Sequence, residues 1–391
     1  MTSKIICSSV SKIFGTEPEQ ALALLRQGLD KDKIHSETGQ VVGVENVNFE
    51  VSDGEIFVVM GLSGSGKSTL VRMINGLIKP SSGRILIDDI DIASCSEEEL
   101  LSLRRNKVSM VFQHFALFPH KTVAENVAFG LKIKGVQAAE RRERAHAVLE
   151  QVGLANRADS YPEELSGGMQ QRVGLARGLA ADPEILLMDE PFGALDPLIR
   201  RDMQAELLEL QRSLKKTIVF ITHDLNEALI LGNRIAIMRN GRFVQVGSAE
   251  EIVGSPANDY VAAFTADIDR SRVFRAKSIA VEPQAIEAGA QVDDAARRME
   301  DLELDALYVT DGDKVAGILT YRSAIEACRC GTKIVREVAS HRFPAASPDA
   351  YLNDLYPMAR MGLPIALRDA HGRLTGVVPP QAVFDKLAGA A

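Results

Sequence analysis

The sequence predicts an α/β protein in which a mixed sheet is packed with helices and is followed by a smaller α+β unit. Through about residue 270, short apolar runs alternate with stretches of helical spacing, the pattern of a sheet covered by helices. Beyond residue 276, a strand–turn–strand–helix unit occurs twice, around 304–328 and again around 362–387. We therefore expect two domains, 1–270 and 276–391, with a linker at 267–275.

Composition narrows the class of protein. A chain of 391 residues that is 46% hydrophobic can bury more than one core. The formal net charge of −8, with no basic stripe, argues against a nucleic-acid partner. No apolar run is long enough to cross a membrane, and residues 1–7 lack the apolar core of a signal peptide. The four cysteines show neither a disulfide framework nor zinc spacing, which fits a reducing, cytoplasmic location.

A charged segment at 16–39 separates two strand-like pieces near the N-terminus. Its apolar residues have helical spacing around 21–25, so we interpret the segment as an inserted helical hairpin. The alternative is a solvated surface excursion.

Residues 61–68 read Gly-Leu-Ser-Gly-Ser-Gly-Lys-Ser and match the phosphate-binding pattern G-x-x-x-x-G-K-[ST]. An apolar strand-like run (55–60) precedes them and a helical stretch (69–75) follows, which places a phosphate at a helix N-terminus. The alternative is a glycine turn that binds nothing. If the loop is functional, the residues that bind the nucleotide are Gly61, Ser63, Gly64, Ser65, Gly66, Lys67, Ser68 and Thr69. Lys67 can reach the β- and γ-phosphates, and the Ser68 hydroxyl can hold Mg²⁺.

An apolar strand at 184–188 ends in two carboxylates. Asp189 can hold the Mg²⁺ shell, and Glu190 can orient and polarise an attacking water. A strand that merely ends in a polar turn is the alternative.

Residues 165–172 read Leu-Ser-Gly-Gly-Met-Gln-Gln-Arg and open a predicted helix at 170–180. Ser166 can cap this helix, while Gly167 and Gly168 leave backbone N–H groups bare for a second anion. Gln113 and His223 each follow a strand-like run, the position where ligands bind in open α/β sheets. Taken singly, either could be an ordinary loop residue.

In this order, the motifs over residues 1–265 resemble those of the nucleotide-binding subunit of ABC transporters. The family's Walker A loop corresponds to 61–68, its Q-loop to Gln113, its signature to 165–170, its Walker B strand to 185–190, its D-loop to 194–196 and its switch histidine to His223. The resemblance implies an ATPase that binds ATP and Mg²⁺ between two copies of the subunit, with the Walker A loop of one copy facing Ser166, Gly167 and Gly168 of the other.

The same resemblance implies roles for single residues. Glu190 would be the catalytic carboxylate, assisted by Lys67 and by His223 at the γ-phosphate. Ser68, Gln113 and Asp189 would hold the metal, and Asp196 of the D-loop would lie in the nucleotide site. The family usually stacks adenine on a tyrosine in the first strand. Here the matching residue is Phe14, directly before the insertion, and its ring can stack in the same way.

Four segments and the early insertion are more closely similar to the ATPases of importers for glycine betaine, proline and choline; the segments are 12–15, 60–66, 115–120 and 194–200. That subfamily carries a C-terminal pair of CBS motifs, which residues 276–391 resemble, as either a sensor or a dimerisation module. The helical subdomain would span about 115–180, and the region 115–125 would dock on the permease. The implied place is the cytoplasmic face of the inner membrane, as a peripheral subunit.

The sequence does not identify the transported substrate. A quaternary ammonium needs an aromatic cage, and this chain has no tryptophan and only 5% aromatic residues. The cage would therefore belong to a separate substrate-binding protein. Two other functions fit the sequence less well. A soluble ATPase acting in DNA repair or on ribosomes is disfavoured by the single cassette, and a nucleotide-sensing regulator is disfavoured by the intact catalytic motifs.

Overall fold

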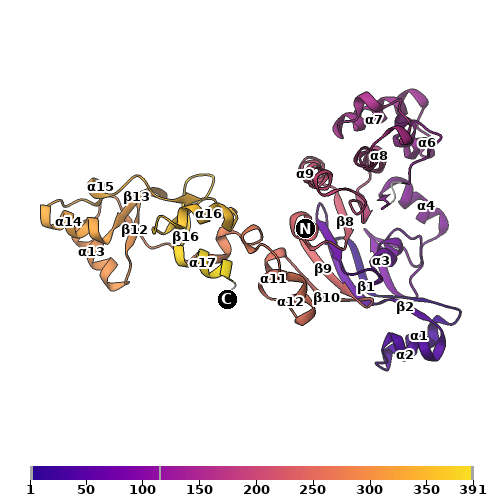
Figure 1. Ribbon diagram of the computed structural model, residues 1–391, viewed down its shortest axis with the longest axis horizontal. Coiled ribbons are helices and arrows are strands. Elements are labelled where there is room, and N and C mark those ends of the chain that lie inside the picture. The colour runs from indigo at the N-terminus through magenta and orange to yellow at the C-terminus, as the bar shows by residue number, and fades with distance from the viewer. Residues whose placement is uncertain (1–2, 114–115, 389–391) are drawn as a thin grey trace. The chain divides into compact units, whose positions relative to one another are not determined.

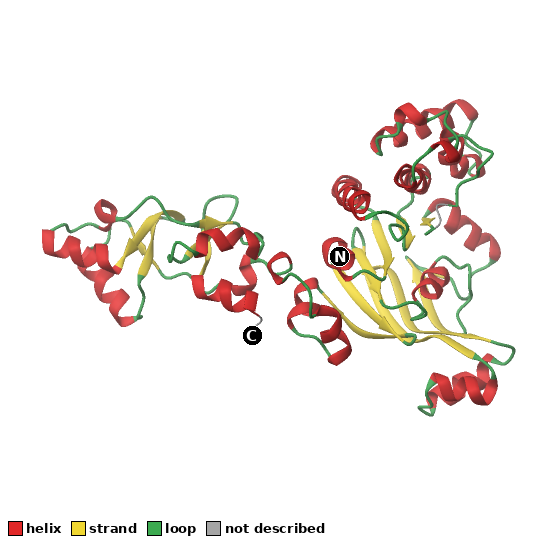
Figure 2. Cartoon of the chain, viewed as in Figure 1, coloured by secondary structure: helices red, strands yellow, loops and turns green. Residues whose placement is uncertain are grey.

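The computed structural model describes residues 3–113 and 116–388, which form two compact units, 1–266 and 267–391 (Figure 1). The first unit is built on sheets with helices around them, and the second on two small sheets with flanking helices (Figure 2). The α/β class is as the sequence predicts.

Two sheets, rather than the single mixed sheet expected, form the centre of the first unit. A six-stranded sheet has the order β10-β9-β3-β8-β7-β6 and is parallel except for β10, whereas a four-stranded antiparallel sheet has the order β2-β1-β4-β5. The strands are β1 (Ser3–Phe14), β2 (Val41–Ser52), β3 (Ile56–Met60), β4 (Ser82–Ile87), β5 (Ile90–Asp91), β6 (Val108–Val111), β7 (Ile185–Asp189), β8 (Thr217–Thr222), β9 (Arg234–Arg239) and β10 (Arg242–Gly247).

Strands β3, β7 and β8 are buried along their whole length. This explains their unbroken apolar sequences, because parallel strands are covered on both faces. The helices near the sheets are α3 (Lys67–Ile74), α4 (Glu97–Asn106), α9 (Pro197–Leu214), α10 (Leu225–Leu231), α11 (Ala249–Gly254) and α12 (Asp259–Thr265). One cluster of buried side chains joins α3 to both sheets, so the phosphate loop is attached to the centre of the core.

A group of helices stands beside the sheets with a core of its own (Figure 1). Its elements are α5 (Val123–Val127), α6 (Phe129–Ile133), α7 (Ala138–Gln151), η1 (Ala155–Arg157), η2 (Pro162–Glu164) and α8 (Gly167–Ala180). Fully buried Val123, Leu131, Leu149 and Val173 lie in that core. The predicted start of this subdomain at residue 115 lies outside the described residues.

The inserted segment forms two helices, α1 (Pro18–Arg26) and α2 (Lys31–Thr38), which Figure 1 shows next to the ends of β1 and β2. The Asp30 side chain caps α2, and Gly39 ends it in the left-handed conformation (φ 70°). Ala21 and Ile34 are fully buried in a small cluster with Ile13 of β1. The hairpin is therefore fixed to the antiparallel sheet.

The second unit repeats one topology, strand–helix–strand–strand–helix. The first copy consists of β11 (Ala285–Glu287), α13 (Val292–Asp301), β12 (Ala306–Asp311), β13 (Lys314–Thr320) and α14 (Tyr321–Cys330), followed by α15 (Val335–Val338). The second consists of β14 (Ala345–Ala346), α16 (Leu352–Ala359), β15 (Ile365–Arg368), β16 (Leu374–Val378) and α17 (Pro380–Ala388). In both copies the first strand pair is parallel and the second antiparallel. Sequence analysis found only the last three elements of each copy. The opening strands, of three and two residues, are too short to carry a readable period.

The two copies share a buried contact. The Tyr308 hydroxyl of β12 donates to the Pro364 carbonyl oxygen at 2.5 Å and lies 3.3 Å from that of Pro344. Its ring lies in a cluster with Ala366 and Val377 of the second copy. Burial raises the pKa of Tyr308. The unit is therefore one folded body made of two repeats.

The segment predicted as a linker, 267–275, is folded into the second unit. It contains η3 (Arg270–Arg272), leads to η4 (Ala276–Ile279), and buries Val273 and Phe274. Lys386 of α17 lies over the Phe274 ring, 4.4 Å from its centroid. The sequence misleads here because an isolated Val-Phe pair among charged residues shows no periodicity.

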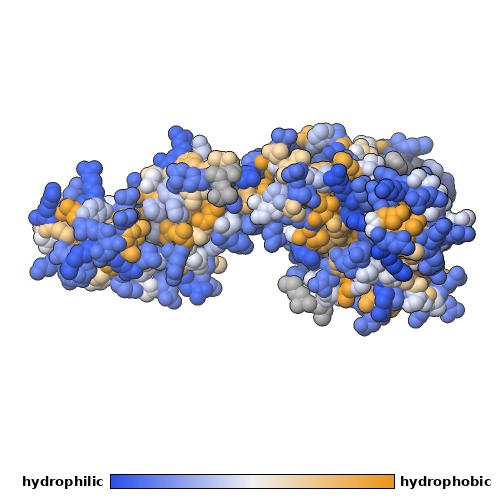
Figure 3. All heavy atoms as spheres, turned by 90° about the horizontal axis from the view of Figure 1, so that it is seen from below, coloured by the Kyte–Doolittle hydropathy of each residue, from blue (hydrophilic) through white to orange (hydrophobic). Residues whose placement is uncertain are grey.

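No helix within 3–113 or 116–388 is both long and apolar enough to cross a membrane. On the face shown in Figure 3, polar side chains are interspersed with small apolar groups over both units.

A chain ended after Ala266 is expected to fold with the thermal transition that the first unit shows in the full protein, because each unit has its own core. Calorimetry of both chains measures this. A chain ended after Arg275 is the matched control: it retains Val273 and Phe274 without their packing partners and should aggregate more readily. A drop of many degrees in the shorter chain's transition would contradict independent folding.

Candidate nucleotide-binding site

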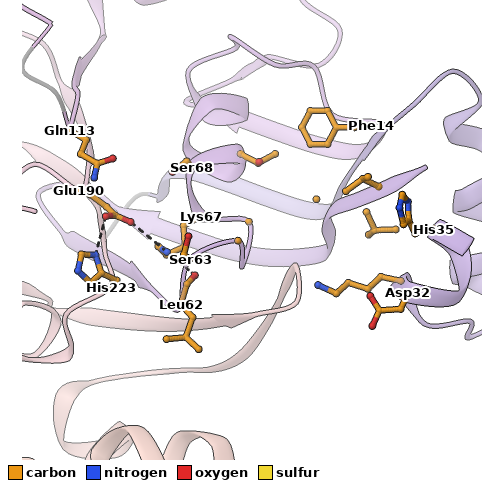
Figure 4. Close-up of a pocket in the computed structure, with 17 residues that line it drawn as sticks. Phe14, Asp32, His35, Leu62, Ser63, Lys67, Ser68, Gln113, Glu190 and His223 are labelled. Carbon is orange, nitrogen blue, oxygen red and sulfur yellow. Dashed lines mark hydrogen bonds and ion pairs between the residues drawn. The ribbon is translucent and has the colours of Figure 1, made fainter. Parts of the chain in front are cut away.

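A cavity of about 910 Å³ opens in the first unit, at the carboxyl ends of β3, β7 and β8 (Figure 4). Its described lining residues come from the phosphate loop, the strand ends, the first two strands and the inserted hairpin. They are Phe14, Lys31, Asp32, His35, Val41, Val42, Gly43, Leu62, Ser63, Gly64, Gly66, Lys67, Ser68, Thr69, Gln113, Glu190 and His223.

The loop between β3 and α3 fits a phosphate group. Gly66 stands at the N-cap of α3 and supplies no side-chain cap, so the N–H groups of the first turn await another acceptor. Only glycine fits at Gly61 and Gly66, since an added Cβ would lie 2.2 Å from the Met238 carbonyl oxygen and 2.4 Å from that of Gly43. The Ser65 hydroxyl is buried without a hydrogen-bond partner among the described residues.

Lys67 is a buried cation, 4% exposed. Its Nζ donates to the carbonyl oxygens of Gly61 (2.8 Å) and Leu62 (3.1 Å) and lies 3.6 Å from Glu190 Oε1. Burial lowers the pKa of Lys67, and the nearby carboxylates Glu190 and Asp189 only partly oppose this. A polyanion bound in the loop would supply the compensating charge that the ammonium lacks.

Ser68 and Asp189 form a pair of oxygen ligands. The Ser68 hydroxyl donates to Asp189 Oδ1 at 2.9 Å, and Asp189 is 6% exposed at the end of β7. Burial raises the pKa of Asp189, and the Ser68 hydrogen bond partly opposes this. Hydroxyl, carboxylate and the nearby Gln113 amide are the hard oxygen donors that suit Mg²⁺. The described residues contain no group of three or more His, Cys, Asp or Glu arranged for a metal, so an ion here would take its remaining ligands from water and phosphate oxygens.

Glu190 links the loop to His223. Its Oε2 accepts from His223 Nδ1 at 2.9 Å, while Oε1 faces Lys67 (Figure 4). The backbone at Glu190 is left-handed (φ 45°) and donates its N–H to the Ile221 carbonyl oxygen at 3.0 Å. A non-glycine residue held in this region is strained, and such strain concentrates at functional sites. The carboxylate is thus aimed at the loop from a fixed backbone.

Behind His223 lies a buried polar network that sequence analysis missed. Glu227 accepts from the Thr222 hydroxyl at 2.6 Å and from Gln204 Nε2 at 3.2 Å. Burial is the main cause that raises the pKa of Glu227. Arg200 lies 3.7 Å from Glu227, donates to Asp224 at 3.3 Å and to the Leu195 carbonyl oxygen at 3.1 Å. It therefore connects the segment around 194–196 to the strand end that carries His223.

The structure brings most predicted site residues together. The ones that line the cavity are Phe14, Ser63, Gly64, Gly66, Lys67, Ser68, Thr69, Gln113, Glu190 and His223. Gly61 and Ser65 belong to the loop behind the lining, and Asp189 is joined to the lining residue Ser68 by a hydrogen bond.

Four other predicted residues, Ser166, Gly167, Gly168 and Asp196, are not among the described residues lining the cavity. Ser166 caps α8, which begins three residues earlier than predicted, by accepting from the Met169 N–H, and Asp196 caps α9. Ser166, Gly167 and Asp196 are exposed.

Seven lining residues were not predicted: Lys31, Asp32, His35, Val41, Val42, Gly43 and Leu62. One signal for the first three exists in the sequence, since the insertion begins immediately after Phe14. A hairpin inserted there has to fold beside the Phe14 side chain.

The geometry defines a P-loop nucleotide-binding site, and comparisons with known proteins give its family. The ABC transporter family model matches residues 44–193, and the CBS domain model matches residues 276–329. The glycine betaine transport ATP-binding protein OpuAA of Bacillus subtilis is 46% identical over 99% of this chain and 93% of its own length. The glycine betaine/proline betaine ATP-binding protein ProV of Escherichia coli is 56% identical over 72% of this chain and 70% of its own.

Two further relatives extend the comparison. The trimethylamine N-oxide ATP-binding protein TmoW of Ruegeria pomeroyi is 49% identical over 83% of this chain and 97% of its own. Among solved structures, the dimeric ATP-binding cassette MJ0796 in a post-hydrolysis state with ADP and Pi is 34% identical, with a TM-score of 0.53, over 62% of this chain and 98% of that one. The chain belongs to the ATP-binding subunits of ABC transporters, an ATPase family, as its motifs predict.

Replacing Asp189 by asparagine is expected to raise the melting temperature of the nucleotide-free protein at neutral pH by about 2 °C, the effect of about 1 kcal/mol in a domain of this size. The reason is that the raised pKa of Asp189 marks an ionised carboxylate that is costly to bury. The gain should shrink as the pH falls from this raised pKa to the lower pKa of the unfolded aspartate, below which the acid is neutral in both the folded and the unfolded chain.

Calorimetry across pH measures the difference, with the exposed Glu143→Gln as a control for loss of one negative charge. A melting temperature of Asp189→Asn equal to or below that of the wild type would contradict the assignment.

Proposed function

We propose that this chain is the ATP-hydrolysing, energy-coupling subunit of an importer for betaine-type compatible solutes: glycine betaine, proline betaine, choline or proline. The observation that carries the proposal is an intact phosphate loop, carboxylate pair and histidine in a chain that aligns over almost its full length with a glycine betaine transport ATP-binding protein. The similarity to TmoW places another methylated amine among the alternatives to be tested.

In the proposed reaction, the phosphate loop and Lys67 hold the β- and γ-phosphates. Ser68, Asp189 and Gln113 would hold Mg²⁺, which would neutralise phosphate charge. Glu190 polarises the attacking water, and its hydrogen bond with His223 keeps its carboxylate aimed at the loop. His223, 55% exposed, has its Nε2 available for the γ-phosphate.

The proposed ATP site is completed by a second copy of the chain. Ser166, Gly167 and Gly168 present the N-terminus of α8, a ready anion site, away from the chain's own phosphate loop. The dimeric state of the related cassette supports this arrangement.

The further proposed partners are a multispan permease and, indirectly, a substrate-binding protein that carries the aromatic cage. We propose a peripheral position at the cytoplasmic face of the inner membrane, with the segment 115–125 as the permease contact. Phe115 lies outside the described residues, and α5 begins within the segment at Val123.

Residues 276–391 are proposed to act as a tandem CBS-like module, either a sensor or a dimerisation device. Residues 320–323 resemble only in part the Ser/Thr-x-x-Asp pattern with which CBS motifs contact a ribose, since no Asp follows in register. Thr320 is the N-cap of α14 and pairs with Ser323 at 2.8 Å, so this hydroxyl is already used inside the fold. This favours ionic strength over a nucleotide as the signal.

When the chain is assembled with its permease in vesicles, ATP hydrolysis should proceed in step with glycine betaine uptake. Glu190→Gln should keep ATP binding but lower both rates by about two orders of magnitude or more, because the general base is lost. Lys67→Ala should instead lose ATP binding, since the phosphate charge is then unpaired. Near-normal hydrolysis by Glu190→Gln would overturn the catalytic assignment, and uptake of trimethylamine N-oxide alone would overturn the substrate class.

The ATPase rate of the isolated chain should rise more than linearly with protein concentration, because each active site needs two copies. Steady-state assays over a dilution series, with the mass measured by light scattering, test this. Gly167→Asp, which puts a negative charge at the exposed start of α8, should bind ATP but hydrolyse it slowly at every concentration. A rate per chain that stays constant down to dilute monomer would argue against the sandwich.

A further inference from the structure

The inserted hairpin forms part of the nucleotide cavity. Lys31, Asp32 and His35, all from α2, line the same space as Phe14 and the phosphate loop. Figure 4 shows Asp32 and His35 on the side of the cavity where Phe14 lies, away from the Glu190–His223 pair. The phosphates belong at the loop, so this side would face the nucleoside.

This wall is fixed by packing. Ile34, between Asp32 and His35 in sequence, is fully buried with Ile13 and Val42. The start of α2 is held by the Asp30 side chain, which accepts from the Asp32 and Lys33 N–H groups at 2.6 and 3.3 Å. The side chains that face the cavity are therefore presented from a helix whose position is set by the sheet.

Phe14 is placed as the stacking face. Its ring lies so close to β2 that a Cβ at Gly43 would come within 2.8 Å of Cε2. The side chain is still 40% exposed toward the cavity. A glycine at 43 is thus needed to seat the ring. The Lys12 ammonium lies over the ring, 5.3 Å from its centroid, so a base would stack on the part of Phe14 that faces the cavity, beside this cation.

The hairpin offers acceptors for hydrogen bonds. His35 Nδ1 donates to the Gln40 carbonyl oxygen at 3.3 Å, so Nε2 is the acceptor in the neutral imidazole. The Asp32 carboxylate is an acceptor as well. The donors on ATP are the ribose hydroxyls and the adenine amine, both in the nucleoside, whereas the phosphates carry only acceptors at neutral pH. A carboxylate on a ribose hydroxyl is also how dinucleotide-binding folds hold their ligand.

We propose that the helical insertion completes the nucleoside end of the ATP site, with Asp32 and His35 accepting hydrogen bonds from the nucleoside that stacks on Phe14. The inference rests on the proposed ATP site and adds to it a set of contacts that the cassette motifs do not supply.

The negative charge of Asp32 allows the two cases to be told apart by the direction in which its removal changes ATP affinity. If this carboxylate only stood near the site, its removal would reduce repulsion and leave ATP binding unchanged or slightly tighter. If it accepts a hydrogen bond from the nucleoside, its removal weakens ATP binding despite the lost repulsion. Tripolyphosphate, which has the phosphates but no nucleoside, separates the two cases.

The experiment measures dissociation constants of ATP and of tripolyphosphate for the full chain by calorimetry. Asp32→Ala and His35→Ala are each expected to weaken ATP binding about tenfold, the scale of one lost hydrogen bond to a charged or well-placed group, and to leave tripolyphosphate binding unchanged. Glu37→Ala is the matched control, since Glu37 is an exposed residue of the same helix outside the described lining, and both of its constants should equal those of the wild type.

ATP affinities of Asp32→Ala and His35→Ala equal to or above the wild-type value would overturn the proposal. An equal loss for ATP and tripolyphosphate would also overturn it, because the hairpin would then act on the phosphate loop. Failure of the proposed function is distinguishable, since the wild-type chain would then bind neither ligand.

Discussion

The buried Lys67 ammonium is the interaction on which the rest of the site depends. A cation that is 4% exposed has to be held by opposite charge or by dipoles, and here it has two loop carbonyls and the Glu190 carboxylate. Those contacts fold the phosphate loop around Lys67 and draw Glu190 toward it. Glu190 in turn holds His223. The buried charge of Lys67 thus holds the ends of three strands together. A bound phosphate would replace the loop carbonyls and Glu190 as the partner of this ammonium.

Much of this centre could be predicted from the sequence, because parallel strands place their carboxyl ends at one edge of the sheet. Once β3, β7 and β8 are read as buried strands, the residues that follow them, the loop at 61–68, Glu190 and His223, have to meet. Local motifs therefore sufficed for the phosphate loop, the carboxylates and the helix cap at Ser166, whereas Asp196, expected in the nucleotide site, caps α9 instead.

The parts that sequence analysis missed depend on contacts between distant segments. The pairing of β1 with β2 across the hairpin makes a second sheet, and nothing in either strand alone distinguishes that sheet from the first. Likewise, the Arg200–Glu227 contact joins two helices whose sequences each read as ordinary amphipathic segments. Asp32 and His35 looked like solvated charges because hydropathy does not tell a cavity wall from open surface.

The position of α8 makes hydrolysis depend on the pairing of two chains in the proposed sandwich. Under the proposed sandwich, the phosphate loop is one half of an active site and the α8 N-terminus is half of another, so the concentration of paired chains sets the rate. Any module that changes the fraction of paired chains then regulates ATP hydrolysis by mass action, without contacting the nucleotide. A repeat unit joined through Tyr308 into one body could serve as such a module. A sensor and a dimerisation device are therefore compatible roles for residues 276–391, because control of pairing is itself a means of control.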